Sequence, residues 1–224
     1  MSNIKYIVSF DIGKKNFAFC ISKIYMNKVN KLDKIIKKER YNKDGTPTEK
    51  FQKVIDKLYK CSKIEIMRNL DLTEGCDKKK YLDDKTYLNL IDVLDEYKNF
   101  WNKCDYILIE KQMSFRGKFN VMAMKLAQFV FSYFTIKYRD NKPIIDYPAY
   151  HKTQVLGANK SEVKQKPKRK KWAIKKSQEI LDYIKDTKGL EEWNKYKKKD
   201  DVSDCMLMNI TYVHLHFIDK LYYS

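Results

Sequence analysis

The sequence has few of the residues that build disulfide frameworks and zinc sites. Five cysteines and three histidines occur in 224 residues. The number of cysteines is odd and none stand in a C-x-x-C pair, while His214 and His216 are two positions apart and would face different ways on a helix. These patterns argue against a disulfide framework and a His/Cys zinc site, and they favour a reducing compartment.

Long apolar runs are also missing. No segment approaches the roughly 18 uninterrupted apolar residues that indicate a membrane span, and residues 1–5 lack the apolar stretch of a signal peptide. We therefore expect a soluble, intracellular protein without a membrane partner.

Acidic residues are outnumbered by basic ones, 29 to 47, which gives a formal net charge of +18. A surplus of this size favours a polyanionic partner, because the chain would otherwise repel itself. Nucleic acid is the leading candidate and an anionic membrane surface is the second. A Lys-rich, AT-biased genome would also account for part of the excess.

The order of expected elements indicates an α/β fold with a mixed sheet and helices around it. Runs of β-branched and aromatic residues predict strands at 4–12, 16–22, 34–41, 64–72, 106–110 and 144–147. Apolar residues every three or four positions predict helices at 48–61, 83–103, 120–138, 172–185 and 202–217. Residues 160–171 are expected to form a basic connection, and 190–199 a charged segment.

Four acids stand where burial is otherwise expected. Asp11 and Glu110 each end an apolar strand, and Asp201 and Asp204 are three apart at the start of the last helix, so both project from one side of it. Each has an ordinary alternative: Asp11 as a turn acid before Gly13, Glu110 as an exposed strand end, and Asp201 as a helix cap.

Converging buried carboxylates would repel one another unless a cation lies between them. Hard, oxygen-only ligands favour magnesium or manganese over zinc. Two such ions, about 4 Å apart, can activate a water and stabilise the leaving oxygen of a phosphodiester. The acids therefore predict metal-dependent hydrolysis of a nucleic acid.

Four short motifs follow one another along the chain. They are Ser-Phe-Asp-Ile-Gly-Lys-Lys-Asn (9–16), Ile-Leu-Ile-Glu-Lys-Gln (107–112), Arg-Lys-Lys-Trp-Ala-Ile (169–174) and Lys-Lys-Asp-Asp-Val-Ser-Asp-Cys (198–205). Together they resemble the motifs of the RuvC-type Holliday-junction resolvases, most closely those of poxviruses and related large DNA viruses. The likeness spans residue 4 to about residue 215.

The resemblance implies an RNase H-like fold, with a central mixed sheet of an antiparallel hairpin plus parallel strands, in one domain spanning 1–224. It implies a homodimer that makes paired nicks across four-way junctions and so processes recombination and replication intermediates. A poxvirus-like protein would act in the host-cell cytoplasm. The segments 41–83 and 185–199 look like insertions relative to the compact members.

The resemblance also assigns roles to residues. Asp11, Glu110, Asp201 and Asp204 would bind Mg²⁺, with Mn²⁺ as a substitute. Lys171 would match a catalytic lysine, with Lys170 one position away as the alternative. Further basic residues would contact DNA phosphates, giving affinity without sequence reading. They are Lys14, Lys15, Arg116, Lys118, Lys168, Arg169 and Lys170.

Other interpretations remain beside this one. The apolar helix 120–138 serves either as a dimer element or as a helix buried within one subunit. A ribonuclease H acting on RNA–DNA hybrids shares the fold and the metals, and a non-catalytic DNA-binding protein shares the charge. An actin- or sugar-kinase-like ATPase is disfavoured, because no second Asp-x-Gly phosphate loop follows residue 13.

Overall fold

Runs of β-branched and aromatic residues form the central sheet of the protein. The structure, a computed structural model, describes residues 3–76, 81–112 and 120–222. Within these residues the sheet has five strands in the order β3-β2-β1-β4-β5. They are β1 (Ile4–Asp11), β2 (Phe17–Tyr25), β3 (Ser62–Leu70), β4 (Tyr106–Glu110) and β5 (Ile144–Tyr147).

The sheet is mixed, as the sequence predicted. β1 and β2 form an antiparallel hairpin, and β3 adds antiparallel to β2 with an irregularity at Ile21/Ser22. β1 and β4 are parallel, and so are β4 and β5. Parallel pairing brings the carboxyl ends of β1 and β4 to the same edge of the sheet.

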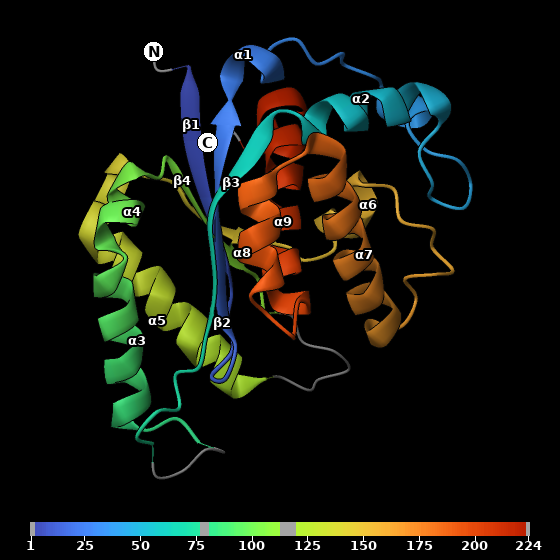
Figure 1. Ribbon diagram of the computed structural model, residues 1–224. Helices are drawn as coiled ribbons and strands as arrows, with labels where there is room; N and C mark the ends of the chain where they lie inside the picture. Colours follow the sequence, from blue (N-terminus) through green and yellow to red (C-terminus); the bar gives the residue numbers. More distant parts are fainter. Residues whose placement is uncertain (1–2, 77–80, 113–119, 223–224) are drawn as a thin grey trace.

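Helices cover both faces of the sheet (Figure 1). One layer contains α3 (Asp84–Glu96), α4 (Lys98–Lys103) and α5 (Val121–Tyr138). The other contains α2 (Glu49–Tyr59), α6 (His151–Val155), α7 (Lys166–Ile184), α8 (Thr187–Asn194) and α9 (Asp200–Val213). Shorter turns complete the chain: α1 (Met26–Val29), 3₁₀ turns at Lys37–Glu39 and Arg139–Asn141, and a π turn at His214–Ile218.

Alternation along β1 divides the core in two. Ile7 belongs to the core beneath α9, whereas Val8 and Phe10 belong to the core beneath α4 and α5. α9 packs on β1 and β2 and is itself covered by α6 and α7. Every residue of α9 except Asp204 is consequently buried.

Three expected elements differ from the structure. Residues 34–41 do not form a strand, because Ile35 packs into the core while the buried Arg40 binds the Ile35 carbonyl and Asp219. The helix expected at 83–103 is two helices, interrupted at Tyr97 by a backbone of φ −93° and ψ 11°. The connection expected at 160–171 already contains the start of α7, where Pro167 occupies the first turn.

The remaining strands and helices lie within a few residues of their expected positions. The segment expected to be charged, 190–199, includes the second half of α8. In the part of the chain that the structure describes, no helix combines the length and apolar character that crossing a membrane requires.

Candidate metal centre

Two acids meet because the strands that carry them are neighbours. Phe10 of β1 is in register with Ile109 of β4, so the next residues, Asp11 and Glu110, end the two strands side by side. Both strands run from the interior to this edge, where apolar side chains give way to carboxylates. Asp11 is partly buried, and the Glu110 side chain is 15% exposed.

A third acid comes from α9, which is bonded to the sheet beside the site. The Ser9 hydroxyl donates to the Cys205 carbonyl oxygen at 2.7 Å, and the Cys205 thiol lies 3.5 Å from the Ala18 carbonyl oxygen. These contacts hold the first turns of α9 against β1 and β2. Asp204 therefore faces the strand ends, and Asp11, Glu110 and Asp204 each offer an oxygen within 4.8 Å of the others.

A lysine occupies the space between these carboxylates. Lys152, on the short helix α6, is 5% exposed. Its ammonium donates to Glu110 at 2.8 Å and lies 3.0 Å from an oxygen of Asp204. The sequence alone does not single out Lys152, because this residue belongs to no recognisable motif and lies 42 positions after Glu110.

The pKa directions follow from burial and from Lys152. Burial, followed by the charges of Glu110 and Asp204, raises the pKa of Asp11 well above its usual value. Burial alone would also raise the pKa of Glu110, but the charge and hydrogen bond of Lys152 bring it below normal. Burial would lower the pKa of Lys152, yet the surrounding carboxylates raise it. The lysine is therefore held charged among anions.

Asp201 lies at the rim of this cluster, outside the closely spaced trio. Its carboxylate contacts Lys198 and lies 3.9 Å from Lys170. The neighbouring Asp200 pairs with the same two lysines. Burial would raise the pKa of Asp200, but the hydrogen bond and charge of Lys170 lower it.

The two lysines considered for catalysis have different surroundings. Lys170 is 38% exposed in its side chain and pairs with the acids at the start of α9. Lys171 is exposed on α7, and among ion pairs of the described residues none involves it. Lys170, the alternative kept open from sequence, is thus the one that faces the acidic rim.

The residues expected to contact DNA are distributed unevenly. Lys15, Lys168 and Arg169 are exposed. The ammonium of Lys14 is instead directed into the protein, toward the Tyr81 carbonyl and Asp83. Arg116 and Lys118 lie outside the described residues.

The residues present fit a divalent cation such as magnesium. The trio supplies only carboxylate oxygens, which are the ligands that hard cations prefer. Three carboxylates surround a single ammonium, that of Lys152, so the cluster has negative charge left for a further cation. The donor set therefore suits Mg²⁺ or Mn²⁺, and it contains neither the sulfur nor the imidazole of a zinc site.

No protein-family model matches the chain. Two curated viral proteins are similar to it over nearly its whole length. Protein 97L of Invertebrate iridescent virus 3, described as uncharacterized, is 32% identical over 210 residues, which cover 90% of this chain and 96% of that protein. Protein 170L of Invertebrate iridescent virus 6, also described as uncharacterized, is 31% identical over 250 residues, which cover 96% of this chain and 91% of that protein.

Solved structures show the same fold. The fowlpox virus resolvase in complex with Holliday junction DNA has a TM-score of 0.52 and 20% identity, over 93% of this chain and 97% of that one. The yeast mitochondrial Holliday junction resolvase has a TM-score of 0.53 and 17% identity, over 96% of this chain and 82% of that one. RuvC of Thermus thermophilus has a TM-score of 0.53 and 11% identity, over 94% of this chain and 96% of that one. The expected RuvC-like, RNase H-like fold is confirmed.

Proposed function

This chain belongs to the family of proteins 97L and 170L of the invertebrate iridescent viruses, and we propose that it is a metal-dependent endonuclease that resolves four-way DNA junctions. The observation that carries the proposal is the meeting of Asp11, Glu110 and Asp204 around Lys152. The fold, shared with three junction resolvases, and the net charge of +18 support it.

We assign each side chain a role from its position. Asp11, Glu110 and Asp204 hold the metal, and Asp201 joins them from the rim. Bound Mg²⁺ would lower the pKa of a water and offset charge on the scissile phosphate. Once a cation shares the carboxylates, the Lys152 ammonium can also bind a phosphate oxygen, and it would then take the catalytic place that the resemblance gave to Lys171.

The rim lysines fit a DNA-binding role. Lys170 and Lys198 form ion pairs with Asp200 and Asp201 in the protein without DNA. When DNA binds, its phosphates can act as further anionic partners for both lysines. Lys15, Lys168 and Arg169 add exposed positive charge. Contacts of this kind hold the backbone without reading sequence, which suits an enzyme that recognises a branch.

We also propose that the enzyme is a homodimer joined through α5. A four-way junction has near two-fold symmetry, and two related sites would place one cut on each of two strands. α5 carries exposed apolar residues along its outer face, among them Val121, Met124 and Ile136.

The relatives are viral proteins, so we place the activity in the infected cell; action in the host-cell cytoplasm stays a prediction.

The decisive experiment compares three substrates side by side: a synthetic four-way junction, a linear duplex and an RNA–DNA hybrid. We expect paired nicks in the junction that need Mg²⁺ or Mn²⁺ and stop with a chelator. Preference for the hybrid would instead identify a ribonuclease H. Binding without cutting of any substrate would identify a non-catalytic DNA-binding protein.

Asp11→Asn provides the matched control, because it removes one negative charge and keeps the shape of the side chain. We expect junction cleavage to fall about a thousand-fold, since a metal contributes several kcal/mol to the transition state. Junction binding, measured by fluorescence anisotropy, should be retained. Full-rate cutting by this variant would remove the metal assignment.

A further inference from the structure

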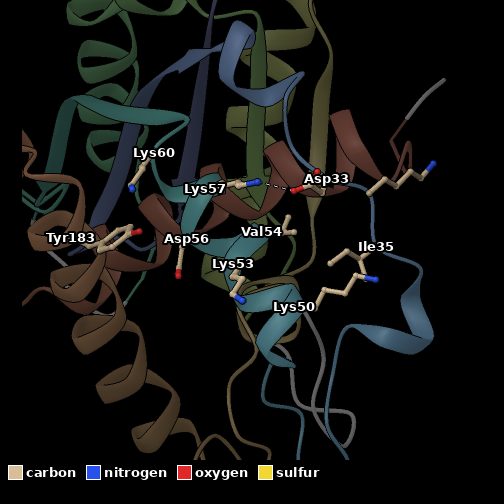
Figure 2. Close-up of a pocket in the computed structure, with 10 residues that line it drawn as sticks. Asp33, Ile35, Lys50, Lys53, Val54, Asp56, Lys57, Lys60 and Tyr183 are labelled. Carbon is tan, nitrogen blue, oxygen red and sulfur yellow. Dashed lines mark hydrogen bonds and ion pairs between the residues drawn. The ribbon is translucent and has the colours of Figure 1, made fainter.

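A second basic surface lies away from the carboxylates, on α2. It lines an open hollow of about 590 Å³ between α2, residues 33–35 and the end of α7. Figure 2 shows Lys50, Lys53 and Lys57 projecting from α2 and Tyr183 at one end of the hollow. The hollow is lined by Asp33, Lys34, Ile35, Lys50, Lys53, Val54, Asp56, Lys57, Lys60 and Tyr183.

Positive charge is concentrated in this part of the chain. Five lysines line the hollow against two aspartates. The segment 26–60, which contains α2, has ten lysines and one arginine against five acids. One third of the net charge of +18 thus falls in 35 residues, in a region overlapping the expected insertion at 41–83.

The lysines of α2 stand in a row along one side of the helix. Lys50, Lys53 and Lys57 are three and four positions apart and share a face. Their backbone positions span about 10 Å of helix axis, at about 1.5 Å per residue. One strand of duplex DNA carries about three phosphates over that length, at about 3.4 Å each. A row of this kind matches a phosphate backbone better than a single compact anion.

These lysines can exchange their present partners for phosphate. Lys50, Lys53 and Lys57 pair with Glu39, Glu49 and Asp33 at 3.3, 2.9 and 2.8 Å. The three lysine side chains are 57–71% exposed, and ion pairs so exposed contribute little free energy.

Two more lysines of the hollow, Lys34 and Lys60, have no acidic partner among the described residues. Lys60 lies over the ring of Tyr183, with its ammonium 4.9 Å from the ring centre.

The row lies in the same helical layer as the candidate metal centre, at the far end of α9. Phe51 of α2 packs on His214, just past the C-terminal end of α9, with ring centres 5.5 Å apart. Asp204 lies ten residues earlier, about 15 Å along the axis. Four to five base pairs cover this length, which is short compared with one arm of a junction.

We propose that this row, Lys50, Lys53 and Lys57 with Lys34 and Lys60 beside it, binds the phosphate backbone of a duplex DNA arm. The proposal rests on the proposed function, because it names where an arm of the junction lies. The surface would strengthen binding without touching the scissile phosphate. It would therefore act on affinity and leave the chemical step unchanged.

The test compares two triple variants with equal loss of charge. Lys50→Gln, Lys53→Gln and Lys57→Gln together remove the row. Lys85→Gln, Lys98→Gln and Lys103→Gln remove three exposed lysines from α3 and α4, in the opposite helical layer. Binding of a four-way junction and of a plain duplex is measured by anisotropy in a chelator, at several salt concentrations.

We expect the α2 variant to bind at least ten-fold more weakly near 0.1 M salt, and its plot of log K against log salt to be shallower by about two to three. The α3–α4 variant should match the wild type. Single-turnover junction cleavage at saturating protein should be equal in all three proteins. Unchanged affinity and slope in the α2 variant, or equal losses in both variants, would overturn the proposal.

The two proposals fail separately. A wild type that cleaves junctions, together with an α2 variant of unaltered slope, removes only the α2 surface. A wild type that cleaves no junction, together with an α2 variant of shallower slope on plain duplex, removes only the junction-resolving function. If the α2 variant loses binding to poly-glutamate but none to DNA, the surface recognises acidic protein and the proposal is wrong.

Discussion

At the scale of single residues, Lys152 supplies the positive charge that stabilises the buried carboxylates close to one another. Taking one partner out of a buried ion pair costs about 3–5 kcal/mol, because the remaining charge is left uncompensated. Glu110 and Asp204 both depend on the same ammonium. A metal bound by these acids must share them with Lys152.

This sharing predicts how Lys152→Met changes stability. Without metal, the variant should melt at a lower temperature than the wild type, because the acids lose their cation. Mg²⁺ should then raise the melting temperature of the variant more than that of the wild type, since nothing competes for the carboxylates. Thermal unfolding with and without Mg²⁺ measures both effects. Lys171→Met, at an exposed position, is the control, and equal Mg²⁺ effects in the two lysine variants would contradict the prediction.

His214 predicts a dependence of stability on pH. Burial lowers its pKa to about 4, despite the nearby Asp219. Because the unfolded chain takes up this proton near pH 6.5, stability should fall as pH drops from about 6.5 to about 4, by up to about 3 kcal/mol. His214→Gln keeps an acceptor for Arg40, which lies 3.2 Å from the ring nitrogen, and removes the titration. Urea unfolding at several pH values should show a flatter profile for this variant; parallel profiles would refute the assignment.

The sequence revealed the acids but not the lysine between them, for a physical reason. Asp11 and Glu110 each end an apolar strand, where a buried carboxylate is costly, so their positions alone indicated a site. Lys152 is one of 47 basic residues and sits on a five-residue helix. Its burial depends on the packing of α6 against α9, which no local pattern records.

At the scale of elements, α8 protects the outer edge of the sheet. The backbone N–H groups of Ile64 and Met67, on β3, donate to Asp186 at 2.8 Å and to Glu192 at 3.2 Å. Exposed strand edges tend to pair with other chains. The two segments expected to be insertions, 41–83 and 185–199, thus support each other in the structure.

We therefore expect Asp186→Ala to destabilise the protein by about 2–4 kcal/mol. The carboxylate is 2% exposed and also caps α8 by accepting from the Gly189 N–H at 3.2 Å, so two hydrogen bonds are lost. Urea unfolding measures the change. Glu191→Ala, exposed on the same helix, should change the free energy of unfolding by less than about 0.5 kcal/mol. Similar values for the two variants would show that the edge contacts contribute nothing.

Helices and strands were predictable where the spacing of apolar residues was regular and the same residues are buried in the structure. The spacing of Phe51, Val54 and Leu58 defined α2 because the same residues are buried. Residues 34–41 have a strand-like composition, but Arg40 is bound by Asp219, 179 positions away. A contact across that separation overrides local preference and cannot be inferred from eight residues.

At the scale of the whole molecule, the mixed sheet joins three segments far apart in sequence into one site. Residues near 11, 110 and 204 meet because β1 and β4 are parallel neighbours and α9 crosses behind them. The sequence predicted the strand ends, and the family resemblance supplied their convergence. What neither supplied is whether α5 faces another subunit.

The exposed apolar face of α5 makes the proposed dimer testable by substitution. The outer face of α5 exposes 39% of Met124 and 76% of Ile136, apolar surface that a second subunit would cover. Met124→Glu with Ile136→Glu would place charge in that contact. By light scattering we therefore expect the wild type to be a dimer and this variant to be a monomer. The metal centre lies on other elements, so the variant should still nick junctions.

Coupling of the two cuts should nevertheless be lost, because each monomer carries one site. On a supercoiled plasmid with an extruded cruciform, the wild type should give linear product directly, whereas the variant should accumulate nicked circles. Ile36→Glu, at a position 52% exposed in the segment before α2, is the matched control and should remain dimeric. A wild-type monomer that still makes paired cuts would mean that one chain resolves the junction alone, and the exposed face of α5 would need another partner.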